Sequence, residues 1–237
     1  MVVASSINAL GFHYGVKDTE IKYLPVDEDL PICISDPYSF SKQITEETAA
    51  YYWRREGITS FCLRLPGVVS ATQENRIRFR EWLPRSRQAV AEWLALPESE
   101  QGERIQQLYR ALTDLRALRF QELPLEERRK IGKDFSNPEV RMTNNLTDFW
   151  TLIEAEDSAQ AFEKCLLADV VGSYPLFVND GHNTLGLPSE TLARVFFPQV
   201  LQRRQILAGS EGLVSIAKAR QLIGFEPEYI FNERLQQ

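Results

Sequence analysis

The sequence predicts an α/β fold, the C-terminal half of a doubly wound parallel sheet with a mostly helical C-terminal lobe. A short apolar strand is expected over residues 2–4, a helix over 38–56 and a second strand over 59–65. Asp36 and Pro37 favour the start of that helix, as N-cap residue and as a proline in the first turn. A strand, a helix and a strand at this spacing are typical of a parallel crossover.

Residues 74–141 are expected to form two or three amphipathic helices, because their apolar side chains recur at helical spacing. Acidic residues nearly balance the arginines of this segment, so we expect a solvated face with local ion pairs. Beyond residue 149 the pattern is mixed. It predicts a helix over 158–167, a strand over 176–179, a helix opening at Pro188 and a last helix over 215–223.

Composition excludes several classes of protein. The 237 residues carry 27 basic and 33 acidic side chains, and this net charge of -6 gives no general attraction to nucleic acid or to an anionic membrane. The sequence has no targeting segment and no apolar run of about 18 residues. Cys33, Cys62 and Cys165 are widely spaced, which argues against a disulfide framework and favours the cytoplasm. Neither His13 nor His182 has a metal-ligand partner at suitable spacing, so no metal is expected.

Tyr38 and Lys42 are the residues whose pattern points to chemistry. They lie four residues apart, on one face of the expected helix. A free tyrosine is a poor base at neutral pH, but a nearby ammonium group favours its phenolate form and suits it to proton transfer. Ser6 could hydrogen-bond the same substrate oxygen. The plainer alternative is an ordinary amphipathic helix with an exposed lysine and a half-buried tyrosine.

The surrounding residues resemble the extended short-chain dehydrogenase/reductases, the epimerase/dehydratase group that acts mainly on nucleotide sugars and related carbonyl or hydroxyl compounds. Residues 2–11 look like the family strand that ends in a serine pair, and Tyr38 and Lys42 fall on the Tyr-x-x-x-Lys motif. The acidic loop 25–29 is similar to the substrate-side loop, and 63–69 to the next strand and the loop that passes the nicotinamide.

The resemblance assigns roles to individual residues. It implies that Ser6, rather than Ser5, is the catalytic hydroxyl, that Tyr38 moves the proton, and that Lys42 assists Tyr38 and holds the nicotinamide ribose. Residues implied to bind the cofactor, NAD or NADP, are Tyr38, Lys42, Pro66 and Val68. Matches over 153–159 and 218–227 concern the fold more than the chemistry.

One family feature has no counterpart in the sequence. Members open with a strand and a Gly-x-x-Gly-x-x-Gly turn that holds the pyrophosphate, whereas Gly11 and Gly15 follow the serine strand at the wrong spacing. We therefore divide the chain into a partial Rossmann-like catalytic region (1–73), a helical insertion (74–148) and a C-terminal substrate-side lobe (149–237). Cofactor binding by this chain alone is expected to be weak or absent.

Three interpretations remain open. The chain is an N-terminally truncated NAD(P)-dependent epimerase, dehydratase or reductase, inactive without its cofactor-binding half. Alternatively, it is a non-catalytic binding or dimerisation remnant, or an enzyme whose cofactor half comes from another chain. The expected partners are a small-molecule substrate, such as a nucleotide sugar or another carbonyl or hydroxyl compound, and a second copy bound through the helix after Asp36. Neither nucleic acid nor a membrane is expected.

Overall fold

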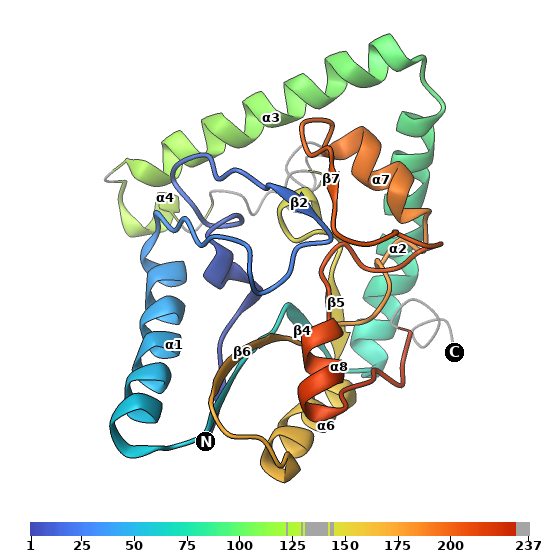
Figure 1. Ribbon diagram of the computed structural model, residues 1–237. Helices are drawn as coiled ribbons and strands as arrows, with labels where there is room; N and C mark the ends of the chain where they lie inside the picture. The colour runs from blue at the N-terminus through green and yellow to red at the C-terminus, as the bar shows by residue number, and fades with distance from the viewer. Residues whose placement is uncertain (122, 129, 131–141, 143–144, 231–237) are drawn as a thin grey trace.

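The structure is a computed structural model that describes residues 1–121, 123–128, 130, 142 and 145–230 (Figure 1). Its first elements are β1 (Val2–Ala4), the 3-10 helix η1 (Ile7–Leu10), β2 (Tyr23–Leu24), α1 (Pro37–Glu56), β3 (Ser60–Arg64) and β4 (Gly67–Val69). The helices α2 (Gln73–Leu94), α3 (Glu98–Phe120) and α4 (Leu125–Arg128) follow. The remaining elements are β5 (Leu152–Glu154), α6 (Ala155–Leu167), β6 (Ser173–Phe177), α7 (Ser189–Phe196), β7 (Gln202–Arg203) and α8 (Ala217–Ile223).

The main sheet has the strand order β1-β3-β6, and both pairings are parallel. Alternate residues of the central strand β3 point to opposite faces. Phe61 and Leu63 pack with α6 and α8, whereas Arg64 faces α1. Helices therefore cover both faces of the sheet, with α1 on one side and α6 and α8 on the other (Figure 1). The predicted α/β fold and its parallel crossover are confirmed.

Local capping chemistry fixes the ends of α1 where the sequence predicts them. The Asp36 side chain accepts a hydrogen bond from the backbone N–H of Ser39 at 2.8 Å. Gly57 ends the helix with φ of 69°, a left-handed conformation that glycine adopts without steric cost. Two predictions were less accurate at their boundaries: the strand expected over 176–179 is β6, Ser173–Phe177, and the helix expected over 158–167 begins earlier, at Ala155.

The long helices α2 and α3 cover a second core. Leu83, Val90 and Trp93 of α2 and Ile105 and Leu108 of α3 are buried there, in the same cluster as residues from both ends of the chain. Stacked aromatic rings lie at its centre, with the ring centroids of Phe149 and Phe197 5.6 Å apart. In Figure 1, α3 passes over the N-terminal segment and α2 lies beside α7. The predicted helical segment therefore folds back over the rest of the chain, although residues 122, 129 and 131–141 of it lie outside the described residues.

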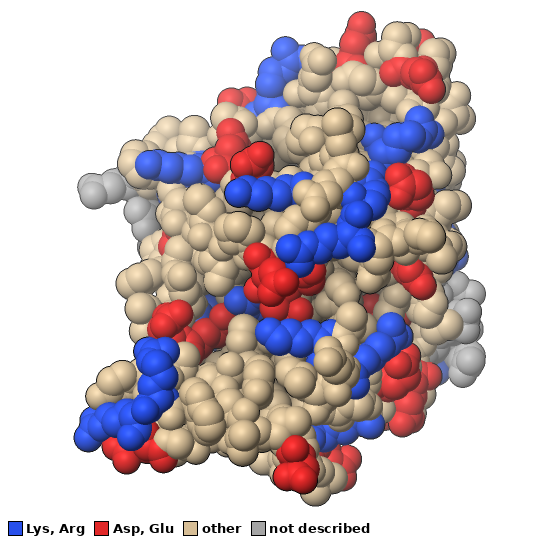
Figure 2. All heavy atoms as spheres, viewed as in Figure 1, with Lys and Arg blue, Asp and Glu red and all other residues tan. Residues whose placement is uncertain are grey.

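Charge is distributed evenly over the face drawn in Figure 2, where Lys and Arg side chains lie among Asp and Glu side chains. No helix among the described residues is both long enough and apolar enough to cross a membrane.

A buried ion pair joins α1 to the central strand. Arg64 donates from Nε to Glu46 Oε1 at 3.0 Å and from Nη2 to Oε2 at 2.8 Å, while Ser5 Oγ donates to the same Oε1 at 2.6 Å. The side chains of Arg64 and Glu46 are only 2% and 9% exposed. The guanidinium also lies 5.2 Å from the ring centroid of Phe177. These contacts fix α1 on the sheet in one register.

Glu46→Ala is expected to destabilise the fold by about 3–5 kcal/mol, because it leaves the buried Arg64 charge without a partner. Urea denaturation followed by circular dichroism measures the change. The exposed neighbour Glu47 supplies the matched control, and Glu47→Ala should change the free energy of unfolding by less than about 0.5 kcal/mol. Equal effects of the two substitutions would contradict a structural role for the ion pair.

Candidate functional site

The serine pair lies at the carboxyl end of β1, and its two members are bonded differently. Ser5 donates its hydroxyl to Glu46, as described above. Ser6 is the N-cap of η1, and its Oγ accepts a hydrogen bond from the backbone N–H of Asn8 at 3.1 Å. Because Ser6 Oγ serves there as an acceptor, its own hydrogen can be donated to another group.

Tyr38 and Lys42 occupy the first two turns of α1, beside this strand end. Lys42 Nζ donates to the backbone carbonyl of Ala4 at 3.2 Å and lies 5.7 Å from the ring centroid of Tyr38. Tyr38 itself is 45% exposed. The structure thus places Tyr38 and Lys42 beside the end of β1. The last residue of that strand, Ala4, is two residues before Ser6.

Pro66 and Val68 lie on the segment that leaves β3. Val68 belongs to β4, pairs with Ile153 of β5 and is exposed. Among the described residues, no hydrogen bond or ring contact joins Pro66 or Val68 to Tyr38 or Lys42.

The early glycines, Gly11 and Gly15, lie close to the backbone of the same chain. A Cβ atom on Gly11 would come within 2.8 Å of Ile34 Cα, and one on Gly15 within 2.4 Å of the carbonyl oxygen of Gly11. Both glycines are therefore needed for close packing of this chain against its own backbone.

A group of side chains that the sequence did not indicate begins beside Tyr38. The Tyr14 ring meets the Tyr38 ring edge-on, with centroids 5.1 Å apart, and the His13 ring at 4.5 Å. His13 Nδ1 lies 2.7 Å from Thr147 Oγ1 and 3.1 Å from Asp148 Oδ1. A continuous series of contacts therefore leads from Tyr38 through Tyr14 and His13 to Asp148.

Two arginines of α3 hold the loop that carries His13 and Tyr14. Arg116 donates to the carbonyl of Phe12 at 3.0 Å and forms an ion pair with Asp18. Arg119 donates to the carbonyl of His13, and its guanidinium carbon lies 5.8 Å from the Tyr14 ring centroid. The middle helices thus help to shape the site.

Burial shifts the pKa values of His13 and Asp148 in opposite directions. Desolvation, aided by Arg119 and Arg116, lowers the pKa of His13 to about 3. Desolvation raises the pKa of Asp148 to about 7, and Arg119 opposes that change. Both shifts disfavour the charged forms, so between about pH 3 and 7 the pair is mainly neutral imidazole beside protonated carboxyl.

A cavity of about 450 Å³ lies on the other side of Asp148. Residues of α2 form one wall, and the segment that leads into β5 forms the other. Its lining includes Arg78, Phe79, Trp82, Arg85, Asp148 and Trp150. Although protein surrounds most of the Asp148 carboxyl, 41% of its side-chain surface is accessible, as expected for a group that borders a cavity.

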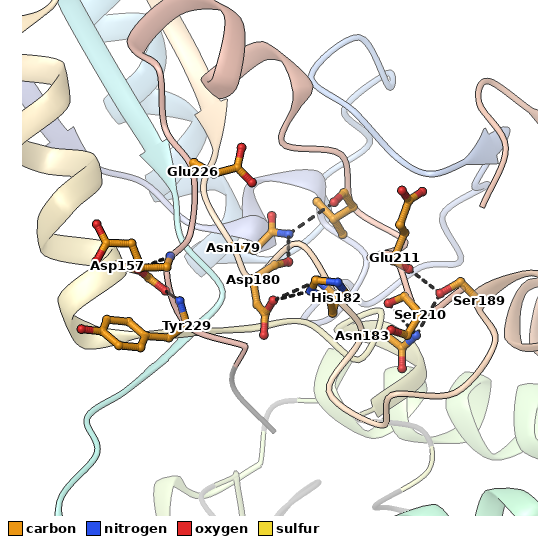
Figure 3. Close-up of polar contacts among 12 residues, drawn as sticks. Asp157, Asn179, Asp180, His182, Asn183, Ser189, Ser210, Glu211, Glu226 and Tyr229 are labelled. Carbon is orange, nitrogen blue, oxygen red and sulfur yellow. Dashed lines mark hydrogen bonds and ion pairs between the residues drawn. The ribbon is translucent and has the colours of Figure 1, made fainter. Parts of the chain in front are cut away.

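A second polar cluster follows β6 and is shown in Figure 3. Asp180 accepts from the backbone N–H of His182 at 3.0 Å, and its Oδ1 lies 3.3 Å from His182 Nδ1. Asn183 donates to Ser189 Oγ at 2.9 Å. Asp157, nearby in Figure 3, accepts from the backbone N–H groups of Glu228 and Tyr229. These bonds connect loops of the same chain, so we assign the cluster a structural role.

Comparisons with known proteins found similar folds but no similar sequences. No family model and no curated protein matches the chain. Among solved structures, RMD from Pseudomonas aeruginosa complexed with NADPH is 16% identical, with a TM-score of 0.46, and the match covers 99% of this chain and 63% of that one. A UDP-N-acetylglucosamine 4-epimerase from Bacillus cereus is 13% identical, with a TM-score of 0.47 and coverage of 99% and 60%.

A third solved structure, from Agrobacterium tumefaciens with bound NAD, is named as a short-chain dehydrogenase/reductase superfamily protein, the group that the sequence resembles. It is 18% identical, with a TM-score of 0.47, and the match covers 99% of this chain and 64% of that one. The chain spans about three fifths of the length of these three proteins.

The pH dependence of stability should reveal the His13–Asp148 pair. The folded state holds an extra proton on Asp148 between pH 3.8 and about 7, so this group makes stability fall as pH rises. The unfolded state holds an extra proton on His13 between about pH 3 and 6.5, so this group makes stability rise with pH. The two slopes oppose each other.

In the Asp148→Asn variant the free energy of unfolding should therefore rise with pH between about 4 and 6.5. In the His13→Gln variant it should fall with pH over the same range. One full proton gives about 1.4 kcal/mol per pH unit, and the slope from Asp148 is smaller because the cavity admits solvent. Chemical denaturation at several pH values gives the slopes. Asp114→Asn, at an exposed carboxylate, serves as the control. Slopes of the same sign in the two variants would disprove the opposed shifts.

Proposed function

We propose that this chain carries the proton-transfer residues of an NAD(P)-dependent epimerase/dehydratase-like oxidoreductase, with Ser6, Tyr38 and Lys42 as the catalytic group. The observation that carries the proposal is the position of Lys42 Nζ, 3.2 Å from the carbonyl of Ala4 and 5.7 Å from the Tyr38 ring centroid. In open parallel sheets, ligands bind beyond the carboxyl ends of the strands. This is where Ala4 ends β1.

Each residue has a definite role in the proposal. Tyr38 gives a proton to, or takes one from, the substrate oxygen, and Lys42 lies beside the Tyr38 ring. Ser6 donates a hydrogen bond to the same oxygen, a role supported by the commitment of Ser5 to Glu46. Lys42 would also hold the nicotinamide ribose, and Pro66 and Val68 would lie against the cofactor. NAD or NADP, when bound, supplies or accepts the hydride.

The proposed substrate is a small carbonyl or hydroxyl compound, a nucleotide sugar being one example, and the proposed compartment is the cytoplasm. We expect the chain alone to bind NAD and NADP weakly and to be inactive, because its sequence has no Gly-x-x-Gly-x-x-Gly turn to hold a pyrophosphate.

With a dinucleotide-binding half supplied, fused or as a second chain, Tyr38→Phe should lower turnover by about 10²–10⁴-fold and leave cofactor affinity nearly unchanged, because only the phenolic proton is lost. Lys42→Ala should reduce both turnover and cofactor affinity. Steady-state kinetics and calorimetry provide the two measurements. Tyr51→Phe, at an equally exposed tyrosine of α1, is the matched control. Small and equal effects of the Tyr38 and Lys42 substitutions would refute the catalytic assignment.

The second candidate function is a binding or dimerisation module, favoured by the exposed apolar residues of α1. Phe40 is 54% exposed and Ile44 is 48% exposed, and their spacing of four residues places them on one helix face. Tyr51 and Tyr52 extend the exposed aromatic surface along the helix. A second copy of the same helix would cover this surface.

If α1 pairs with a second copy, light scattering at micromolar concentration should give the mass of a dimer. The double substitution Phe40→Glu and Ile44→Glu should then give monomers, because it buries like charges at the contact. Phe120→Glu, at an exposed apolar residue of α3, is the control and should leave the mass unchanged. A wild-type chain that remains monomeric at all concentrations would rule out this interface.

A further inference from the structure

The cavity beside Asp148 presents two cations on one face of α2. Arg78, Trp82 and Arg85 are separated by four and three residues, a spacing that aligns side chains along a helix. All three line the cavity. Within the part of the chain that the structure describes, neither Arg78 nor Arg85 takes part in an ion pair or a hydrogen bond, in contrast to Arg116 and Arg64.

The charges that line the cavity favour an anionic ligand. Glu81 is the only lining acid besides Asp148 among the described residues. Below pH 7, where the Asp148 carboxyl is mainly protonated, the two guanidinium groups are opposed by the single Glu81 carboxylate. His13 Nδ1 lies 3.1 Å from Asp148 Oδ1. A ligand carboxylate or phosphate would neutralise the remaining positive charge and accept hydrogen bonds from the N–H groups of the two arginines.

Aromatic rings form another part of the cavity wall. Phe79 and Trp82 meet edge to face, with centroids 5.4 Å apart, and Trp150 is held by an edge contact with Phe196 at 5.1 Å. Such rings provide flat apolar surface against which a ligand ring packs. The volume of about 450 Å³ suits a small molecule.

We propose that this cavity binds a small ring-bearing anion, whose carboxylate or phosphate is held by Arg78 and Arg85 and whose ring packs against Trp82. The proposal goes beyond the proposed function, because Ser6, Tyr38 and Lys42 are not among the residues that line the cavity. As a binding site, it stands on the lining of the cavity.

Calorimetry on the full chain, with tryptophan fluorescence as a second signal, tests binding with four probes. Benzoate and phenyl phosphate carry a ring and an anion, benzyl alcohol carries only the ring, and inorganic phosphate only the anion. At least one ring-bearing anion should bind saturably, about 10-fold or more tighter than either control, because benzyl alcohol lacks the charge-assisted contact and inorganic phosphate lacks the ring contact. The preferred ring-bearing anion identifies carboxylate or phosphate as the natural group.

Arg78→Gln and Arg85→Gln should each weaken binding of the preferred probe by about 10-fold. Both residues are exposed on a helix, so the variants should keep the wild-type circular dichroism and melting temperature. Trp82→Ala should weaken binding of the ring-bearing anion and leave the weak binding of inorganic phosphate unchanged. Arg54→Gln, at an exposed arginine of α1 away from the cavity lining, is the matched control and should bind as the wild type does.

Two results would overturn the inference: no saturable binding of either ring-bearing anion at millimolar concentration, or equal affinities for the wild type and the Arg78 and Arg85 variants. Tyr38→Phe, assayed with a dinucleotide-binding half supplied, separates this failure from a failure of the proposed function. If the probe binds and Tyr38→Phe leaves turnover intact, the proton-transfer assignment is wrong and the cavity remains a binding site. If Tyr38→Phe abolishes turnover and no probe binds, the cavity inference is wrong and the proton-transfer assignment stands.

Discussion

Arg64 and Glu46 meet in the interior between β3 and α1, and the arrangement of the candidate site depends on this contact. A guanidinium that is 2% exposed needs a carboxylate partner, because an unpaired charge in the protein interior is costly. Glu46 can serve as that partner only when α1 lies on the sheet in one register. In that register Lys42, one turn earlier, meets the carbonyl of Ala4, and Ser5 is bound to the same carboxylate. A structural ion pair thus also positions the residues proposed to carry the chemistry.

The middle helices contribute to the site as well as to the core. Apolar residues of α2 and α3 are buried against segments from both ends of the chain. On the polar side, Arg116 and Arg119 hold the loop of His13 and Tyr14, while Arg78 and Arg85 face the cavity. The sequence predicted a solvated face with local ion pairs for this segment. That description holds for exposed residues such as Arg110, whereas Arg116 is 3% exposed and lies over the Phe12 ring.

The opposed pKa shifts of His13 and Asp148 have a common physical origin. Each group loses water on folding, and each is more easily buried in its neutral form. A proton that histidine would hold in the unfolded chain at pH 5 therefore resides on the carboxyl group in the folded protein. The site consequently contains a protonated acid beside a cavity, within a few contacts of Tyr38. This is a suitable setting for a second group that exchanges protons with a ligand.

The sequence by itself determined the features that depend on near neighbours. The cap at Asp36, the stop at Gly57 and the spacing of Tyr38 and Lys42 are local, and the α/β class follows from the order of short strands and a helix. Only the tertiary structure decided that His13 meets Asp148, that Arg64 meets Glu46 and that Arg78 and Arg85 face a cavity. Hydrophobic periodicity states which face of an element is buried but not which distant element covers it. These pairings join residues that are distant in the sequence, so they depend on how the sheet and the long helices pack together.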